Sequence, residues 1–184
     1  MNTEDRIVKA FKEMACQQGI NAVRMEELAA RAGITKKTIY AYFTGKRDLV
    51  DRLVDAFNSE VSYQFEIVMT KSDLIENVAA TIEHVLKEGA FLFNIQSLKD
   101  LQTYYPETWQ KLLQFRINMV NSVIDIIFKR TKKKWVLEMD PRIIREALLA
   151  INSRFATPEF AVEMNMSVEE LTYQFAKLTI YPYL

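Results

Sequence analysis

The segment from Lys36 to Phe43 concentrates cationic, hydroxyl and phenolic side chains within about two helical turns. Ile39 and Phe43 are four residues apart, which places them on one face of a helix and favours their burial. The polar side chains then face outward: Lys36, Lys37, Thr38, Tyr40 and Tyr42. Such groups can contact phosphate oxygens and base edges in a major groove, so this helix is suited to contacting DNA.

A second apolar pattern precedes this segment and predicts a helix over residues 25–32. Its buried face is formed by Leu28, Ala29 and Ala32. Gly33 is placed to end that helix, and Thr35 to begin the next one, because its hydroxyl can accept from free backbone N–H groups of the first turn. Two short helices joined by a tight glycine turn form a helix-turn-helix, whose second helix enters the major groove.

The whole segment resembles the helix-turn-helix of the TetR family of bacterial repressors. The family pattern contains Ala-x-x-Ala-Gly-hydrophobic-Ser/Thr, hydrophobic-Tyr-x-Tyr/His-Phe and Lys-x-x-Leu elements. The matching residues here are Ala29, Ala32 to Thr35, Ile39 to Phe43 and Lys46 to Leu49. The resemblance extends over about residues 7–53, and beyond them only length and helical character agree. It implies a three-helix DNA-binding head, completed by a first helix that begins near Thr3.

The resemblance also implies two kinds of DNA contact. The phosphate-binding positions of the family correspond here to Thr35, Tyr42 and Lys46. The positions nearest the base edges correspond to Lys36, Lys37, Thr38 and Tyr40. Lys37 and Tyr40 are the expected readers, because lysine favours guanine and the tyrosine ring favours the thymine methyl group. The open alternative is a solvated lysine pair with tyrosines half-packed into the head.

Two residues depart from the family pattern. Arg24 stands where the family usually has a threonine N-cap, so it loses a cap and can add a phosphate contact. Lys37 stands where the family often has a small residue. No operator sequence is therefore carried over from the family.

Composition is consistent with a DNA-binding head on a non-binding body. Hydrophobic residues make up 49% of the 184, so disorder is not expected. The formal net charge is zero, but residues 1–50 carry nine basic and six acidic side chains, which leaves the remainder net acidic. This asymmetry is typical of a nucleic-acid-binding segment joined to another domain.

Helical spacing and capping signals predict an all-helical protein of about nine helices. We expect a DNA-binding domain over residues 1–46 and a larger helical bundle for ligand binding and dimerisation over residues 47–184. The connecting helix starts near Gly45 and continues well past residue 60. Further helices are expected over 73–87, from Pro106 to about Arg130, from Pro141 to Phe155, and after Ser167.

A DNA-binding function implies a homodimer, because a single head contacts few phosphates and would bind weakly. Two heads reach successive major grooves of a palindromic operator when they are about 34–36 Å apart. In the TetR family the last two helices of each chain form the interface, which corresponds here to residues 142–155 and 168–180. Their apolar faces could equally belong to the intrachain core.

Aromatic and apolar side chains of the body could line a pocket for an unknown small-molecule effector. The candidates are Phe57, Phe65, Phe91, Phe93, Trp109, Phe115, Met119 and Phe155, with His84, Gln96, Asn118 and Asn121 as polar contacts. Core packing is the alternative for each of them. A bound effector would tilt the connecting helix near residues 49–57, so that one head no longer fits its half-site. The coupling free energy between effector binding and DNA binding would be about 1–3 kcal/mol.

Enzymatic chemistry and a resident cofactor are not expected. One histidine and one cysteine cannot form a Cys/His metal cluster, and four glycines offer no phosphate-cradling loop. With Cys16 alone, no intrachain disulfide can form. No apolar run of about 18 residues suggests a membrane span, and the polar start MNTEDR is not a signal peptide, so we expect a cytoplasmic protein without a membrane partner.

Two other functions stay open: an effector-independent DNA-binding protein, and a helical adaptor whose head binds protein. Residues 100–109 also resemble a segment found in a subset of the family. The residue types in this segment do not by themselves predict a chemical role for it.

Overall fold

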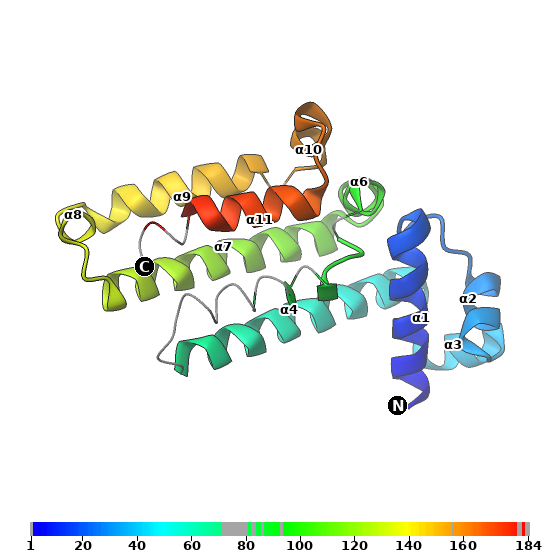
Figure 1. Ribbon diagram of the computed structural model, residues 1–184. Coiled ribbons are helices and arrows are strands. Elements are labelled where there is room, and N and C mark those ends of the chain that lie inside the picture. Colours follow the sequence, from blue (N-terminus) through cyan, green and yellow to red (C-terminus); the bar gives the residue numbers. More distant parts are fainter. Residues whose placement is uncertain are drawn as a thin grey trace.

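The computed structural model describes residues 2–70, 81, 84, 85, 87–92, 94–155, 157–179 and 182 (Figure 1). Within these residues every regular element is a helix, which confirms the predicted all-helical fold. Ten helices are described: α1 (Thr3–Gln18), α2 (Met25–Ala32), α3 (Lys36–Tyr42), α4 (Lys46–Thr70), α6 (Ile95–Tyr104), α7 (Pro106–Arg130), α8 (Lys134–Leu137), α9 (Pro141–Phe155), α10 (Pro158–Met164) and α11 (Val168–Thr179). The helix predicted over 73–87 lies largely outside the described residues.

Several helix starts follow the capping residues expected from the sequence. Pro141 is the first residue of α9, and the Asp140 carboxylate accepts from the Arg142 backbone N–H at 2.9 Å. The Ser167 hydroxyl accepts from the Glu170 N–H at 3.0 Å where α11 begins. The helices α6, α8 and α10 were not expected; α8 and α10, with four and seven residues, are too short to show a helical period.

α1 stands between the helix-turn-helix and the remaining helices (Figure 1). It begins with a capping box: Asn2 Oδ1 accepts from the Asp5 N–H at 2.8 Å, and the Asp5 carboxylate accepts from the Asn2 N–H at 3.3 Å. Its buried stripe is Ile7, Ala10, Phe11, Met14 and Ala15. Gly19 ends the helix with φ of +87°, a value that favours glycine.

One apolar core joins α1–α3, which we call the head, to α4 and the later helices, which we call the body. It includes the fully buried Phe11, Leu28 and Ile39 of the head and the fully buried Leu98 and Leu112 of the body. Burying such side chains stabilises a fold by about 1.5–3 kcal/mol each. A second, smaller cluster lies where α7, α8 and α9 meet: Ile124, Ile127, Val136, Ile144 and Leu148.

The body consists mainly of long helices on one side of α1 (Figure 1). α4 packs against α7, α7 against α9, and α9 against α11. α6 lies at the junction, where it contacts both α1 and α7. In the described part of the chain, no helix combines the length and apolarity that crossing a bilayer requires.

Candidate DNA-binding site

α3 is held to the head by the two side chains predicted to be buried. Ile39 is 0% exposed and Phe43 is 3% exposed, while Tyr40 and Tyr42 are 48% and 50% exposed. The predicted division of this helix into an apolar and a polar face is confirmed. The phenol groups therefore lie on a surface that DNA could approach.

The turn before α3 has the geometry that its residue types predict. Gly33 adopts φ of +65°, in the left-handed region that glycine enters without strain. Arg6 donates to the Ala32 carbonyl at 2.5 Å, which fixes α1 to the end of α2. Thr35 Oγ1 accepts from the Thr38 N–H at 3.1 Å, and the two hydroxyls lie 2.8 Å apart. The start of α3 is thus rigidly capped.

Lys36 is paired within the protein. Its ammonium forms an ion pair with Glu26 of α2 and lies 5.9 Å from the centre of the Tyr40 ring. The hydrogen bond between them raises the pKa of Lys36 above its ordinary value and lowers the pKa of Glu26. A phosphate or base that contacts Lys36 must therefore compete with the Glu26 carboxylate.

Lys37 is available for DNA without such competition. It is exposed, and among the described residues its ammonium has no hydrogen-bond, ion-pair or ring partner. Arg24 is also exposed and precedes α2 without a capping bond from its side chain, as the sequence predicts. Both residues can turn toward a phosphate or a base edge at little cost.

Lys46 is engaged elsewhere in the head. Its ammonium donates to the Asn21 carbonyl at 2.6 Å, and this hydrogen bond links the turn between α1 and α2 to the start of α4. Burial lowers the pKa of Lys46 below its ordinary value, and the Asp100 carboxylate opposes that shift. A phosphate contact by Lys46 stays a prediction, and it would require the ammonium to leave or share this carbonyl.

Comparison with known proteins assigns the helix-turn-helix. Residues 7–53 match the family described as bacterial regulatory proteins, tetR family. A Bacillus subtilis protein named as the uncharacterized HTH-type transcriptional regulator YvaF is 22% identical over 175 residues, which span 91% of this chain and 88% of that protein. The chain is therefore similar, through residues 7–53, to the DNA-binding segment of TetR-family transcriptional regulators.

Solved structures extend the likeness in fold over nearly the whole chain. The transcriptional regulator FadR from Bacillus subtilis, in complex with stearoyl-CoA, has a TM-score of 0.63 at 17% identity and covers 96% of this chain and 97% of its own. The TetR-family regulator PfmR from Thermus thermophilus has a TM-score of 0.63 at 18% identity, with coverage of 96% and 98%. At these identities the likeness establishes the fold.

The head is fastened to α6 by a buried carboxylate. Asp100 is 3% exposed; one of its oxygens accepts from the Asn21 N–H at 2.7 Å, and the other from the Gln96 side-chain amide at 2.9 Å. Gly19 packs directly against these groups. A Cβ at this glycine would lie 2.8 Å from Gln96 Cγ and 3.0 Å from an Asp100 carboxylate oxygen.

Two further side chains at the start of α6 bind the last turn of α1. Asn94 donates to the Cys16 carbonyl at 3.0 Å while its own carbonyl accepts from the Ser97 N–H at 3.3 Å. Ser97 donates to the Ala15 carbonyl at 3.3 Å. Carbonyls at a helix C-terminus need partners from outside the helix, and these bonds supply them. We call Asn94, Gln96, Ser97 and Asp100 the α6 clamp.

Residues 100–109 also fasten α6 and α7 to α4. The buried Thr108 hydroxyl donates to the Asp51 carboxylate. Tyr105 is 6% exposed, and the Arg47 guanidinium lies 5.7 Å from the centre of its ring. The sequence alone predicted no role for residues 100–109. In the structure they contact both the α1 end of the head and α4.

The aromatic residues predicted for an effector pocket are distributed over several environments. Phe57 meets Phe91 edge to face, with ring centres 6.1 Å apart. Trp109 is 9% exposed and lies in the core, with the Arg116 guanidinium 5.8 Å from its ring centre. The half-buried candidates are Phe65, Phe115 and Met119. Phe93 and the side chain of Phe155 lie outside the described residues.

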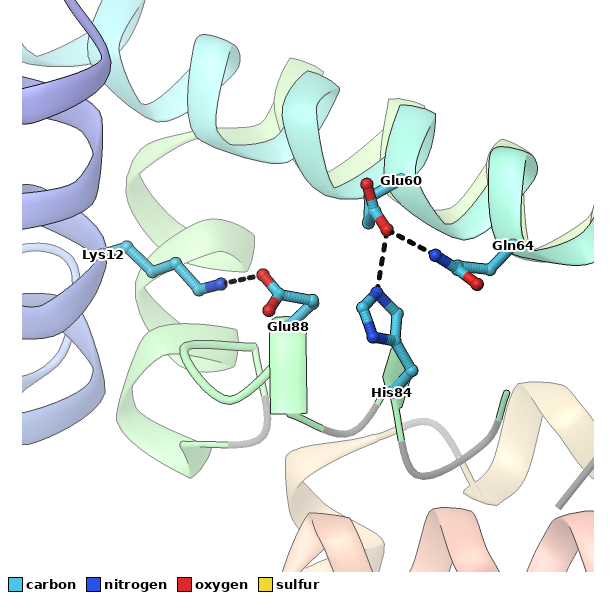
Figure 2. A network of polar contacts seen from close by, with 5 residues as sticks. All are labelled: Lys12, Glu60, Gln64, His84 and Glu88. Carbon is cyan, nitrogen blue, oxygen red and sulfur yellow. Dashed lines mark hydrogen bonds and ion pairs between the residues drawn. The ribbon is translucent and has the colours of Figure 1, made fainter. Parts of the chain in front are cut away.

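Most of the predicted polar contacts have structural partners. His84 Nε2 lies 2.8 Å from Glu60 Oε1, as Figure 2 shows. Gln96 belongs to the α6 clamp, and Asn118 is exposed and accepts from a neighbouring α7 side chain at 3.1 Å. Asn121 differs, because its buried Oδ1 has no hydrogen-bond partner among the described residues. It is the polar candidate best placed to meet a ligand.

Sequence reasoning missed three polar groups inside the body. They are Asp100 of the clamp, Asn58, whose buried Oδ1 has no hydrogen-bond partner in the described part of the chain, and the half-buried Arg116. Burial lowers the pKa of Arg116 to about 10. A signal for Arg116 existed: it is spaced four residues from both Leu112 and Val120, at an apolar position of the helical pattern.

Proposed function

We propose that this protein is a repressor that binds a palindromic operator as a homodimer and releases it when a small molecule binds the body. The observation that carries the proposal is α3, whose cationic and phenolic side chains are exposed on a helix anchored by the buried Ile39 and Phe43. Base reading is assigned to Lys37 and Tyr40. Phosphate contacts are assigned to Arg24, Thr35, Tyr42 and Lys46, with Lys36 and Thr38 beside the bases.

Dimerisation is assigned to α9 and α11. Both helices expose apolar side chains: Ile143 is 61% exposed, Leu178 57% and Tyr173 38%. Clustered exposed apolar surface marks an interaction site on a soluble protein. A second copy packed there would bury these residues and would hold two heads at the spacing of successive major grooves.

The effector is proposed to bind between the helices of the body, where Asn58 and Asn121 each hold a buried oxygen that lacks a partner among the described residues. An unpaired buried oxygen is costly, and a ligand donor would relieve that cost. The FadR structure with a similar fold contains stearoyl-CoA, which supports a small-molecule effector as a class. DNA binding is assigned to residues 1–46, the other functions to residues 47–184, and the protein to the cytoplasm.

The test is selection of genomic fragments with the purified protein, followed by titration of the best fragment and of random DNA. Lys37→Ala and Tyr40→Ala should each lose about 1–3 kcal/mol of discrimination between the two DNAs. Lys132→Ala, which removes an exposed lysine outside the head, is the matched control and should keep full discrimination. Unchanged discrimination in both head variants would contradict the assignment.

The dimer is tested by sedimentation at several protein concentrations. Ile143→Asp combined with Leu178→Asp should give a folded monomer that binds the selected fragment much more weakly. Tyr63→Asp, at a side chain that is 59% exposed on α4, is the control and should remain dimeric. If no sequence is enriched in the selection, the adaptor interpretation is favoured over the repressor.

A further inference from the structure

A groove of about 530 Å³ separates the head from the body along one face of α1. Its walls are α1, the first half of α4 and residues 87–91. Small-molecule sites in proteins commonly enclose about 300–1,000 Å³, so the groove is large enough for a ligand. Its lining includes two of the residues predicted from the sequence for an effector pocket, Phe57 and Phe91.

The floor of the groove is apolar. Its members are Val8, Leu53, Ala56, Phe57, Ala90 and Phe91. Phe57 and Phe91 meet edge to face here; Phe91 is fully buried, so the half-buried Phe57 supplies the ring surface that an aliphatic or aromatic group could cover. A ligand for this floor needs an apolar portion.

The carboxylates around the groove already have partners. Lys12 donates to Glu88 at 2.6 Å across the junction of head and body, and His84 lies 2.8 Å from Glu60 (Figure 2). Arg52 donates to a third carboxylate, that of Glu4, at 2.9 Å. Glu13 forms an ion pair with Arg31 of α2, and Asp5 belongs to the capping box at the start of α1. A cationic ligand would have to displace one of these partners.

Two cations of the groove remain unneutralised. Lys9 and Lys87 both line it, both are exposed, and within the described residues neither ammonium has a hydrogen-bond or ion-pair partner. The groove is lined by five acidic and four basic side chains, and Lys9 and Lys87 are the cations of this lining that have no carboxylate partner within the described residues. An anionic group is the complement of this surface.

We propose that this groove is a binding site for an amphipathic anion, a small molecule with an apolar portion and a single acidic group such as a carboxylate. The apolar portion covers Phe57, and the acidic group lies near Lys9 and Lys87. The site is separate from the buried oxygens of Asn58 and Asn121 to which the effector was assigned above.

Occupancy of the groove changes the position of the head. The α6 clamp holds the C-terminal end of α1, so a ligand between α1 and α4 presses on the part of α1 that the clamp does not hold. This consequence rests on the proposed repressor function, because it predicts a change in operator affinity. Binding to the groove does not rest on it and can be measured without DNA.

Cys16 reports occupancy of the groove. It is the only cysteine, lines the groove, and is half-buried there. Its alkylation by iodoacetamide, followed by mass spectrometry of the whole protein at constant pH, measures access to the groove. Decanoate below its micellar concentration is the anionic probe, and decylammonium is the probe of equal length and opposite charge.

We expect decanoate to slow the alkylation of Cys16 and decylammonium to leave it unchanged. Ala56→Trp fills the groove and should abolish the dependence on decanoate, whereas Ala30→Trp, the same exchange at an exposed site on α2, should retain it. The double variant Lys9→Gln, Lys87→Gln should need roughly tenfold more decanoate for half-protection, since a charge-assisted contact is lost. Lys99→Gln with Lys129→Gln, two exposed lysines outside the groove, should behave as the wild type.

Three results would overturn the proposal. They are equal protection by decylammonium, protection that persists in Ala56→Trp, and no protection by decanoate in the wild type. Circular dichroism of each variant establishes that it is folded, and the lysine variant tests the site even where the tryptophan variant misfolds. A protein that fails to select DNA but still passes this test would contradict the repressor function and leave the groove assignment intact.

Discussion

The C-terminal end of α1 is held by buried groups, whereas one face of the helix, from Glu4 to Cys16, lines an open groove. Asp100 binds the chain after α1 from a position that is 3% exposed. Along the groove the head is tied to the body by two ion pairs, Arg52 with Glu4 and Lys12 with Glu88. A hydrogen bond to a buried charged group contributes about 1.5–3 kcal/mol. An exposed ion pair contributes about 0–1 kcal/mol.

This contrast indicates how the head can move. The end held by the α6 clamp acts as a fixed point, and the part of α1 beyond the clamp can change its distance from α4. A rotation of the head about the clamp would break the ion pairs along the groove and would also shift the apolar core that α1 shares with α4. A displacement of the clamp itself would leave a buried carboxylate without its donors, which is far more costly than the loss of an exposed ion pair.

The largest effect is expected from Gly19→Ala. The added Cβ meets Gln96 and Asp100, and φ of +87° strains any L side chain, so we expect a loss of about 3–5 kcal/mol in the free energy of unfolding. Urea denaturation measures it. Gly45→Ala is the control, because a Cβ there meets nothing within 4 Å, and a loss as large at this position would show that the clamp is not the cause.

Asp100→Ala should have the next largest effect. It leaves the Asn21 N–H and the Gln96 amide without their acceptor, and we expect a loss of about 2–3 kcal/mol. Hydrogen exchange of the Asn21 amide should accelerate in the same variant. Asp125→Ala removes an exposed carboxylate on α7 and should change stability by about 0.5 kcal/mol at most. Equal losses in the two variants would remove the distinction between the ends of α1.

Glu88→Gln tests the groove side of the comparison. It removes the ion pair with Lys12, whose two side chains are 26% and 35% exposed, and we expect a loss below about 1 kcal/mol. Salt near 1 M should abolish most of the difference from the wild type, because it screens exposed charges. A loss as large as that of Asp100→Ala would mean that both ends of α1 are fixed.

The smallest effect concerns the pH dependence of the contact between α4 and His84. Hydrogen bonds from Gln64 and then His84 hold the pKa of Glu60 below its ordinary value of 4.5. Since the pKa is lower in the folded state, this stabilisation is present above the ordinary value and is lost as the pH falls through the folded pKa. Exposure limits it to a few tenths of a kcal/mol, roughly. Unfolding measured below neutral pH should show a shallower acid decline for Glu60→Gln than for the wild type.

The head could be predicted because its determinants are local. Gly33, Thr35, Ile39 and Phe43 act within a turn or two of their own positions, through capping, positive φ and burial. Their spacing alone therefore indicates two helices and the exposed face of the second. The pairing of Lys36 with Glu26 joins residues ten positions apart and was not visible in any single helical pattern.

The clamp and the groove could not be predicted because their partners are distant in the chain. Asp100 lies 79 residues from the backbone N–H that it binds, and Glu88 lies 76 residues from Lys12. A carboxylate that accepts from backbone groups has no complementary side chain to reveal it. The aromatic residues of the body were equally ambiguous, since Trp109 in the core and Phe57 beside the groove both occupy apolar positions of a helical pattern.

The pairing of Lys36 with Glu26 has a consequence for the thermodynamics of DNA binding. The slope of log affinity against log salt counts the counterions that phosphates release when cations replace them. The Glu26 carboxylate already neutralises Lys36, and this carboxylate is still present when DNA binds. Lys36 and Lys37 should therefore contribute to the salt slope as a single cation would. Glu26→Gln should steepen the slope by about one unit, although this substitution adds no positive charge.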